Sequence, residues 1–234
     1  MWRSKAPNLM LPLSAIVTLK DGRQVVLRPL AAADAGELAD FNRETAEDYG
    51  HQVPDPDEAV TDAGALREML AGNDDEGGND EEGGNHEELL RKEEGDRETP
   101  EALLREGERA VGAPESGGRR GGFVLGAFLD SSLLGTVSLF VVSLRKVSHV
   151  GELGLAVLPT SKGLGLGRAL LLAAAAEARR RGFVKLVVRV FADNEPALAL
   201  YRSAGFIEEG RQVRQYLFRD GTFRDGIWMA MFLE

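Results

Sequence analysis

Three glycines, each separated from the next by one residue, stand in the segment Lys162-Gly163-Leu164-Gly165-Leu166-Gly167-Arg168. An apolar run before the segment predicts a strand, and an alanine-rich run after it predicts a helix. The first amides of a helix have no partner within it, and the helix dipole adds partial positive charge beside them. Because glycines let a ligand approach the backbone closely, this turn is predicted to bind an anionic group such as a phosphate. The alternative at this point is a turn that only connects strand and helix.

Two widespread phosphate-binding loops do not match this turn. A Walker loop ends in Gly-Lys-Ser/Thr, whereas Gly167-Arg168-Ala169 stands here. A dinucleotide-binding turn needs the spacing G-x-G-x-x-G and an acidic residue about 20 residues further on. In this chain Gly167 comes one residue too early for that spacing, and no acid ends the following strand. The turn therefore belongs to another class of anion site.

The residue types also exclude several kinds of chemistry. The chain has no cysteine, which excludes disulfides, thiolate metal sites and an acyl-cysteine intermediate. The three histidines, His51, His86 and His149, do not have the spacing of metal ligands, and no nucleophile motif accompanies them. We therefore expect a reaction that needs no metal ion and no covalent enzyme intermediate.

The elements that must position the turn alternate between strands and helices. Strand patterns cover Ile16–Leu19, Gln24–Arg28, Phe123–Leu129, Leu133–Leu144, Val150–Leu158, Val184–Phe191, Phe206–Phe218 and Thr222–Phe232. A helical pattern begins at Asp34, which is placed to cap it. Further helical patterns cover Glu58–Leu70, Thr99–Ala110, Ala169–Arg181 and Asn194–Ser203. A hairpin meander followed by a β-α-β-α-β-β run predicts a mixed fold of the α/β (α+β) class.

Two motifs together resemble the signatures of the GNAT family of N-acetyltransferases. The first is the run from Val157 to Leu170, with the pattern V-x-P-x-x-K-G-x-G-x-G-x-x-L. The second is the run from Asn194 to Phe206, with the pattern N-x-x-A-x-x-x-Y-x-x-x-G-F. The resemblance is good over residues 122–234 and weak over 23–71, and it implies a mixed central sheet flanked by helices. Lys162 departs from it, since arginine or glutamine is usual at that position, and so does an acidic insertion.

The resemblance implies acetyl-CoA as co-substrate. The amides of Gly163, Leu164, Gly165, Leu166, Gly167 and Arg168 would hold its pyrophosphate, with the charges of Lys162 and Arg168 nearby. The backbone at Leu155 and Val157 would bind the pantetheine arm, and an amide there would stabilise the oxyanion of a tetrahedral intermediate. Asn194 would contact the cofactor, cap the following helix, or do both. Lysine and arginine are also common on any surface, so solvated cations are the alternative for Lys162 and Arg168.

Two residues are candidates for proton transfer. Tyr201 lies two helical turns after Asn194 and therefore on the same face, where its hydroxyl would assist the departing CoA thiolate. A core position in an amphipathic stripe is its alternative. Glu152 is the acid of the strand Val150–Leu158 and would deprotonate the amine, directly or through water. Strand alternation gives Glu152 an equal chance of facing outward, so this role stays a prediction.

The resemblance implies a primary amine as the acyl acceptor, and the tail of the chain is similar to a bacterial subgroup that acetylates amino acids and small amines. That likeness rests on Glu208-Glu209-Gly210, Arg219-Asp220-Gly221 and Trp228-Met229-Ala230. Arg211 and Arg214 would bind a substrate carboxylate or lie on the surface. The alternative function is a catalytically silent CoA-binding module that acts in sensing or protein interaction. A homodimer is left open.

The net charge of −10 is concentrated in one segment. Residues 73–98 carry 12 acidic and 3 basic side chains, and the rest carries 26 and 25. That segment has no apolar residue before Leu89, so it cannot bury enough surface to offset the entropy of ordering. We expect an N-terminal extension at 1–15 and an N-acetyltransferase domain at 16–234, interrupted by a disordered acidic insertion at about 72–119.

Charge and hydropathy also bear on partners and location. Outside the acidic segment the chain has no basic excess that would neutralise nucleic-acid phosphates. No apolar run approaches the roughly 18 residues of a membrane span. The first twenty residues lack the long apolar run of a signal peptide. We therefore expect a small-molecule amine as partner, with no nucleic acid and no membrane, and a cytoplasmic location; a short organellar transit peptide is the alternative.

Overall fold

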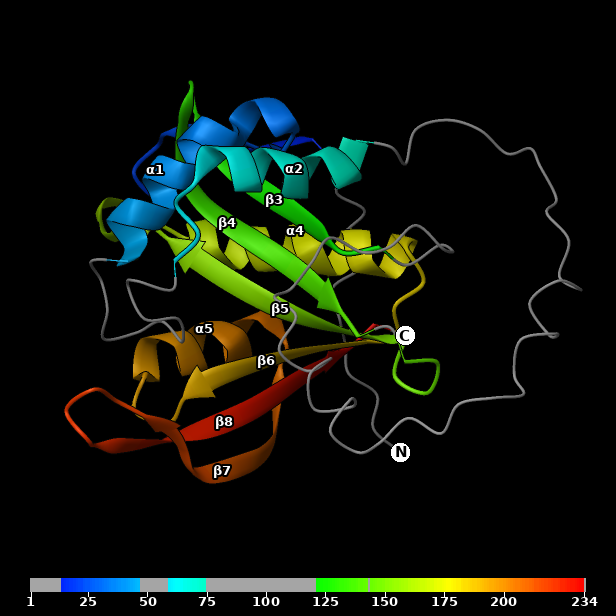
Figure 1. Ribbon diagram of the computed structural model, residues 1–234, viewed down its shortest axis with the longest axis vertical. Coiled ribbons are helices and arrows are strands. Elements are labelled where there is room, and N and C mark those ends of the chain that lie inside the picture. Colours follow the sequence, from blue (N-terminus) through cyan, green and yellow to red (C-terminus); the bar gives the residue numbers. More distant parts are fainter. Residues whose placement is uncertain (1–13, 47–58, 75–120, 143, 234) are drawn as a thin grey trace, which may run out of the picture.

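The computed structural model describes residues 14–46, 59–74, 121–142 and 144–233. These residues form one mixed sheet of eight strands in the order β1-β2-β3-β4-β5-β6-β8-β7 (Figure 1). The strands are β1 Ala15–Thr18, β2 Gln24–Pro29, β3 Phe123–Leu129, β4 Ser132–Val141, β5 Val150–Val157, β6 Lys185–Phe191, β7 Ile207–Leu217 and β8 Phe223–Phe232. The helices are η1 Ala32–Asp34, α1 Ala35–Ala46, α2 Ala63–Asp74, η6 Pro159–Ser161, α4 Leu166–Arg180 and α5 Glu195–Ala204. The predicted α/β (α+β) fold is confirmed.

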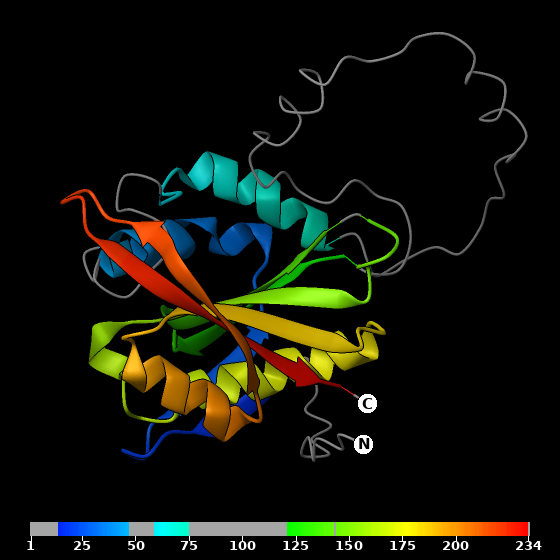
Figure 2. The ribbon, with the colours of Figure 1, turned by 90° about the horizontal axis from the view of Figure 1, so that it is seen from below.

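Strands β1 to β5 pair antiparallel in chain order. In β2 the side chains alternate between the core and solvent, with Val25 and Leu27 buried and Val26 exposed. Helices α1 and α2 lie across one face of this part of the sheet (Figure 2). Leu38 and Phe41 of α1 are buried there, three residues apart as on one side of a helix.

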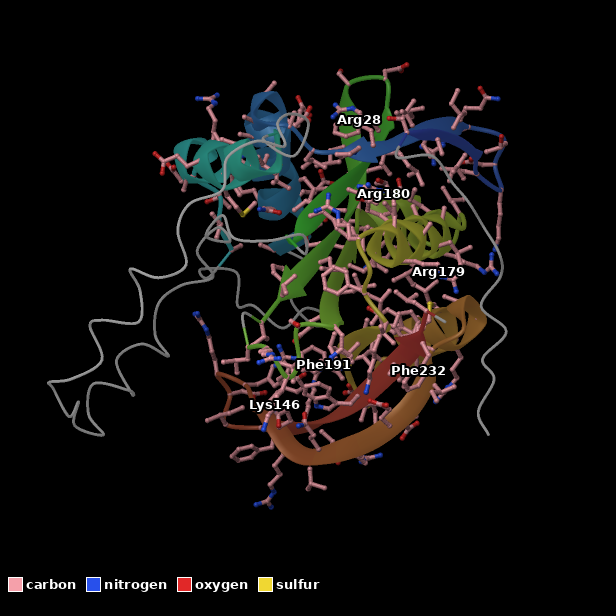
Figure 3. The ribbon with its side chains drawn as sticks, turned by 90° about the vertical axis from the view of Figure 1, so that its right-hand side faces the viewer. Arg28, Lys146, Arg179, Arg180, Phe191 and Phe232 are labelled. Atoms are coloured by element: carbon pink, nitrogen blue, oxygen red, sulfur yellow. The ribbon has the colours of Figure 1, made fainter. Side chains whose placement is uncertain are left out.

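Asp34 connects the end of β2 to the start of α1. Its carboxylate accepts two hydrogen bonds from the Arg28 guanidinium, at 2.6 and 2.7 Å, and one from the Ala31 amide at 2.9 Å. The carboxylate therefore binds backward to Ala31 and does not act as an N-cap of α1. The hydrogen bonds from Arg28, labelled in Figure 3, hold the pKa of Asp34 below its usual value.

The parallel neighbours β5 and β6 need a crossover connection, and α4 supplies it. Helices α4 and α5 lie on the face of the sheet opposite α1 and α2 (Figure 2). Leu170, Leu171 and Ala174 of α4 are fully buried against the sheet. A Cβ on Gly135 of β4 would lie 3.0 Å from Leu170 Cδ1, so a larger residue at position 135 would push α4 away from the sheet.

Most predicted elements are confirmed, with informative shifts at their ends. Helix α2 begins at Ala63, later than predicted, because Asp62 caps it by accepting the Ala65 amide at 2.7 Å. It continues to Asp74, so an insertion starting at residue 72 overlaps a helix. The predicted helix Thr99–Ala110 and residues 75–120 lie outside the described residues. No helix among the described residues has the length and hydropathy of a membrane span.

Candidate active site

The glycine turn lies at the N-terminus of α4, which begins three residues earlier than the sequence pattern predicts. Gly163 and Gly165 have φ values of +77° and +91°, in the region that glycine adopts without strain. Gly165 is the N-cap and offers no side chain to the helix start. The first amide bonded along the helix is that of Ala169, which donates to the Gly165 carbonyl at 3.1 Å. The amides of residues 166–168 are therefore those left open for a ligand.

Space beside the turn differs from one glycine to the next. A Cβ on Gly163 or Gly165 would meet no atom within 4 Å, so these glycines are required by their backbone angles and border open space. A Cβ on Gly167 would lie 3.1 Å from Leu200 of α5, and 3.6 and 3.8 Å from Leu155 and Val157 of β5. Gly167 thus lies at a close contact of α4 with both α5 and β5. This cradle of open amides and small residues fits an extended anionic ligand.

Two cations and a buried hydroxyl border the turn. Lys162 and Arg168 are exposed at its two ends, where both charges would favour an anion. Ser161, which the sequence analysis did not single out, is buried, and its Oγ has no hydrogen-bond partner among the described residues. A small polar residue immediately before a glycine turn was the available signal for it.

Strands β5 and β6 pair only at their beginnings and then diverge (Figure 1). Their register runs from Val150 opposite Lys185 to Glu152 opposite Val187. Beyond that rung, as far as Val157, β5 is paired with β4 but with no other strand among the described residues. We call the opening between the two strands the fork.

The predicted pantetheine-binding residues lie on the fork side of β5. The Leu158 amide donates to the Leu134 carbonyl of β4 at 2.9 Å. Consecutive amides of a strand point to opposite edges, so those of Leu155 and Val157 point away from β4 and into the fork. The His149 carbonyl agrees with this alternation, because it accepts the Lys185 amide on the β6 side at 3.3 Å. Two backbone donors are therefore open on the strand that the turn follows.

Asn194 is the N-cap of α5. Its Oδ1 accepts the Ala197 amide at 3.2 Å, and its side chain is buried. The capping role predicted from Glu195-Pro196 is confirmed. A contact with a cofactor stays a prediction.

Tyr201 lies on α5 within the hydrophobic core. It is 7% exposed, and its ring meets that of Phe206 edge-on at 5.5 Å between centroids. Burial raises the pKa of its hydroxyl to about 12. The hydroxyl is therefore protonated at neutral pH, which suits a proton donor and excludes a tyrosinate nucleophile there.

Glu152 lies on the other face of the sheet. The side chains of Leu155 and Val157 point toward Gly167 of α4, so alternation places Glu152 on the face away from α4. Its carboxylate forms an ion pair with Arg189 of β6, whose Nε donates to Oε1 at 2.7 Å. The Glu152–Arg189 ion pair thus bridges β5 and β6 at the base of the fork.

Arg189 is a residue that the sequence analysis missed. The signal was present, because Arg189 is the single charge in the apolar run Leu186–Phe191.

The predicted carboxylate-binding arginines are arranged differently. Arg211 pairs with Asp225 at 2.8 Å, and the Arg214 amide donates to the same carboxylate at 2.7 Å. Asp225 therefore already pairs with the Arg211 guanidinium, and the Arg214 guanidinium lies over the Phe223 ring, 5.5 Å from its centre. No group of three or more metal-binding side chains forms among the described residues.

Residues 86–206 match the family model of the acetyltransferase (GNAT) family. The chain belongs to this family. It is 35% identical over 97 residues to the [ribosomal protein bS18]-alanine N-acetyltransferase of Escherichia coli, which is 42% of this chain and 65% of that protein. It is 30% identical over 105 residues to an L-amino acid N-acetyltransferase of Escherichia coli, covering 44% and 64%. The chain spans less than two thirds of the length of the curated relatives it matches.

A solved structure shares the fold. A Salmonella typhimurium protein whose structure includes its cofactor acetyl-CoA superposes with a TM-score of 0.61, at 18% identity, over 90% of this chain and 94% of that one. The family and the mixed sheet with flanking helices, both predicted from the two motifs, are thereby confirmed.

Proposed function

We propose that this chain transfers an acetyl group from acetyl-CoA to the primary amine of an amino acid or another small amine. The observation that best supports this is the glycine turn with its open amides, next to the unpaired edge of β5. The amides of residues 166–168 and the cations Lys162 and Arg168 would hold the pyrophosphate. The relatives' names point to amine acceptors as well: a protein alanine in one case and an L-amino acid in the other.

The fork provides the place for the reacting atoms. The amides of Leu155 and Val157 are positioned to bind a pantetheine arm that lies along β5. Acetyl-CoA, when bound, supplies the thioester. One strand amide then donates to the carbonyl oxygen, where negative charge develops during attack, and such fixed donors stabilise charge strongly in a site with little water.

In this proposal each face of the sheet provides one residue for proton transfer. Glu152, directly or through water, takes a proton from the ammonium group, and the free amine forms a C–N bond to the carbonyl carbon. The nitrogen then gives its second proton to solvent, the C–S bond breaks, and the Tyr201 hydroxyl protonates the leaving thiolate; the tyrosinate regains a proton from solvent. The need for a base depends on the amine: a peptide α-amino group with a pKa near 7.8 is roughly one-tenth neutral at pH 7, whereas a lysine amine with a pKa near 10.4 is almost wholly protonated.

Replacing Gly165 with valine tests cofactor binding. A side chain at this positive φ strains the turn and projects into the open space beside it, so we expect acetyl-CoA affinity to fall at least about 10-fold. Gly221→Val is the matched control, because Gly221 has φ +81° and equally open surroundings but lies in the β7–β8 hairpin. Calorimetric titration with acetyl-CoA compares the two variants. Equal affinity in Gly165→Val and wild type would contradict the proposal.

Release of CoA thiol with a panel of amines tests transfer. We expect turnover with at least one primary amine. Tight acetyl-CoA binding without thiol release for any amine in the panel would favour the silent CoA-binding module instead.

A further inference from the structure

Side chains from three strands gather on the face of the sheet that carries Glu152. Arg189 of β6 lies opposite Trp228 of β8, so both point to the same face. On the next rung Phe191, labelled in Figure 3, lies opposite Gly226, which is itself opposite Gln212 of β7. These two rungs adjoin the base of the fork.

Tyr216 of β7 covers this rung. Its ring meets Phe191 edge-on, with 4.7 Å between centroids. A Cβ on Gly226 would lie 3.1 Å from the Tyr216 ring, so the glycine lets the ring lie against β8. The charges of Arg189 and Glu152 both act on the Tyr216 hydroxyl, whose pKa burial raises. The Arg189 guanidinium also lies 5.6 Å from the centre of the Trp228 ring, so Tyr216, Phe191, Arg189 and Trp228 share this face of the sheet.

Three polar atoms in this group are buried without a hydrogen-bond partner among the described residues: Gln212 Oε1, Tyr216 OH and Trp228 Nε1. Among the described residues, one further buried side-chain atom, Ser161 Oγ, lacks a partner. Buried polar groups in folded proteins are nearly always paired, since an unpaired one costs free energy. Three unpaired atoms on neighbouring rungs indicate a site that a ligand completes. We call Glu152, Arg189, Gln212, Tyr216 and Trp228 the acceptor cluster.

The donors and acceptors of the cluster define the ligand. Trp228 Nε1 and Arg189 are donors only, and the Tyr216 hydroxyl can donate. The Glu152 carboxylate and Gln212 Oε1 accept. A matching ligand therefore carries a positive N–H group and, close to it, a group with several acceptor oxygens. A carboxylate supplies two such oxygens for two neutral donors, whereas a peptide carbonyl supplies one.

We propose that the acceptor cluster binds a free α-amino acid, with Trp228 and Tyr216 donating to the α-carboxylate and Glu152 and Gln212 receiving the α-amino group. This inference rests on the proposed function and names its acceptor. It replaces Arg211 and Arg214 as the carboxylate-binding residues. Arg189 holds Glu152 in place and adds positive charge on the carboxylate side.

Matched acceptors test the inference without any mutation. The L-amino acids, their C-terminal amides and the corresponding decarboxylated amines are compared by kcat/KM for CoA thiol release. We expect the best amino acid to exceed its own amide and amine by roughly 10- to 100-fold, as for loss of hydrogen bonds to a charged group. Amides or short peptides used equally well would overturn the inference while leaving acetyl transfer intact. Absence of turnover with every amine would instead contradict the proposed function.

Variants then show which residues cause the preference for an amino acid over its amide. Trp228→Phe and Tyr216→Phe remove one donor each and keep the ring, so we expect KM for the amino acid to rise about 10-fold and the advantage over the amide to shrink. Acetyl-CoA affinity by calorimetry should stay within about twofold. Arg211→Gln is the control: Arg211 lies opposite Ile227, on the other face of the sheet, and should leave the preference unchanged. Equal losses for acid and amide in both phenylalanine variants, or a preference carried by Arg211, would overturn the assignment.

Discussion

At the scale of single residues, burial decides what Tyr201 and Glu152 can do. Tyr201 is surrounded by apolar side chains, so its hydroxyl keeps its proton until the pH reaches about 12. Glu152 is half-exposed and paired with Arg189, so its carboxylate has a fixed orientation at the base of the fork. One residue is suited to give a proton and the other to receive one. Their separation by the sheet matches a reaction in which acceptor and cofactor arrive from opposite faces.

Tyr201→Phe removes the hydroxyl and keeps the ring that packs on Phe206. If the hydroxyl protonates the leaving thiolate, kcat should fall at least about 10-fold while the Kd for acetyl-CoA changes less than about twofold. Steady-state kinetics and calorimetry on the same preparation measure the two quantities. Full turnover per folded molecule, with a change in thermal stability alone, would assign Tyr201 to the core.

At the scale of elements, the starts of α4 and α5 differ in a way that sets their roles. The N-cap of α5, Asn194, has a side chain that accepts the Ala197 amide and satisfies part of that helix start. The N-cap of α4 is Gly165, which leaves the first amides to a ligand. Both helices lie on the same face, and Gly167 lets α4 approach Leu200 of α5. The start of α5 is thus capped by its own side chain, whereas we propose anion binding for the start of α4.

Replacing Asn194 separates capping from cofactor contact. Asn194→Ala should lower the free energy of unfolding by about 1 kcal/mol, since the Ala197 amide loses its acceptor. Asn194→Ser should recover most of this loss, because a serine hydroxyl accepts the same amide. We expect acetyl-CoA affinity to stay reduced in both, since neither presents a carboxamide. Denaturant unfolding and calorimetry distinguish the effects, and full affinity in the serine variant would limit Asn194 to its cap.

At the scale of the whole molecule, the sheet separates the proposed acetyl-CoA site from the proposed acceptor site, and the fork joins them. The glycine turn, α4 and α5 lie on one face (Figure 2), and the strand register places the acceptor cluster on the other. Two titratable groups, Asp34 and Tyr201, make the stability of the fold depend on pH. Arg28 stabilises ionised Asp34, so that stability is lost in acid as Asp34 becomes protonated. Burial favours the neutral form of Tyr201, so stability is also lost at alkaline pH, where an unfolded tyrosine ionises first.

The alkaline limit can be measured. An unfolded tyrosine loses its proton near pH 10, whereas Tyr201 in the fold keeps it to about 12. Between these values the unfolded state binds fewer protons, so the free energy of unfolding should fall by about 2–3 kcal/mol in total. The decline in wild type minus that in Tyr201→Phe, from denaturant unfolding at each pH, isolates this group. Parallel curves for the two proteins would show that Tyr201 is not desolvated.

Local features were predictable from sequence because local physics determines them. A glycine with positive φ before an apolar helix, an asparagine ahead of Glu-Pro and the β7–β8 turn at Gly221 each depend on a few neighbouring residues. The glycine turn, the Asn194 cap and the order of strands and helices followed from such patterns. The start of α4 was misplaced by three residues, because a helical glycine at 167 looks like turn sequence until its φ is known.

The fork and the acceptor cluster depend on the tertiary structure. Alternation along a strand leaves two equivalent faces, and only the packing of α4 against Leu155 and Val157 decides which face Glu152 takes. Its partner Arg189 lies 37 positions away, and the hairpin that carries Trp228 is further still. Register shifts in β7 on either side of Gly210 and Gln212 set where Tyr216 meets the rung of Phe191. The sequence by itself determined the family and predicted the glycine turn as the cofactor site; strand register and face decide which side chains form the proposed acceptor cluster, because those depend on contacts between segments far apart in the chain.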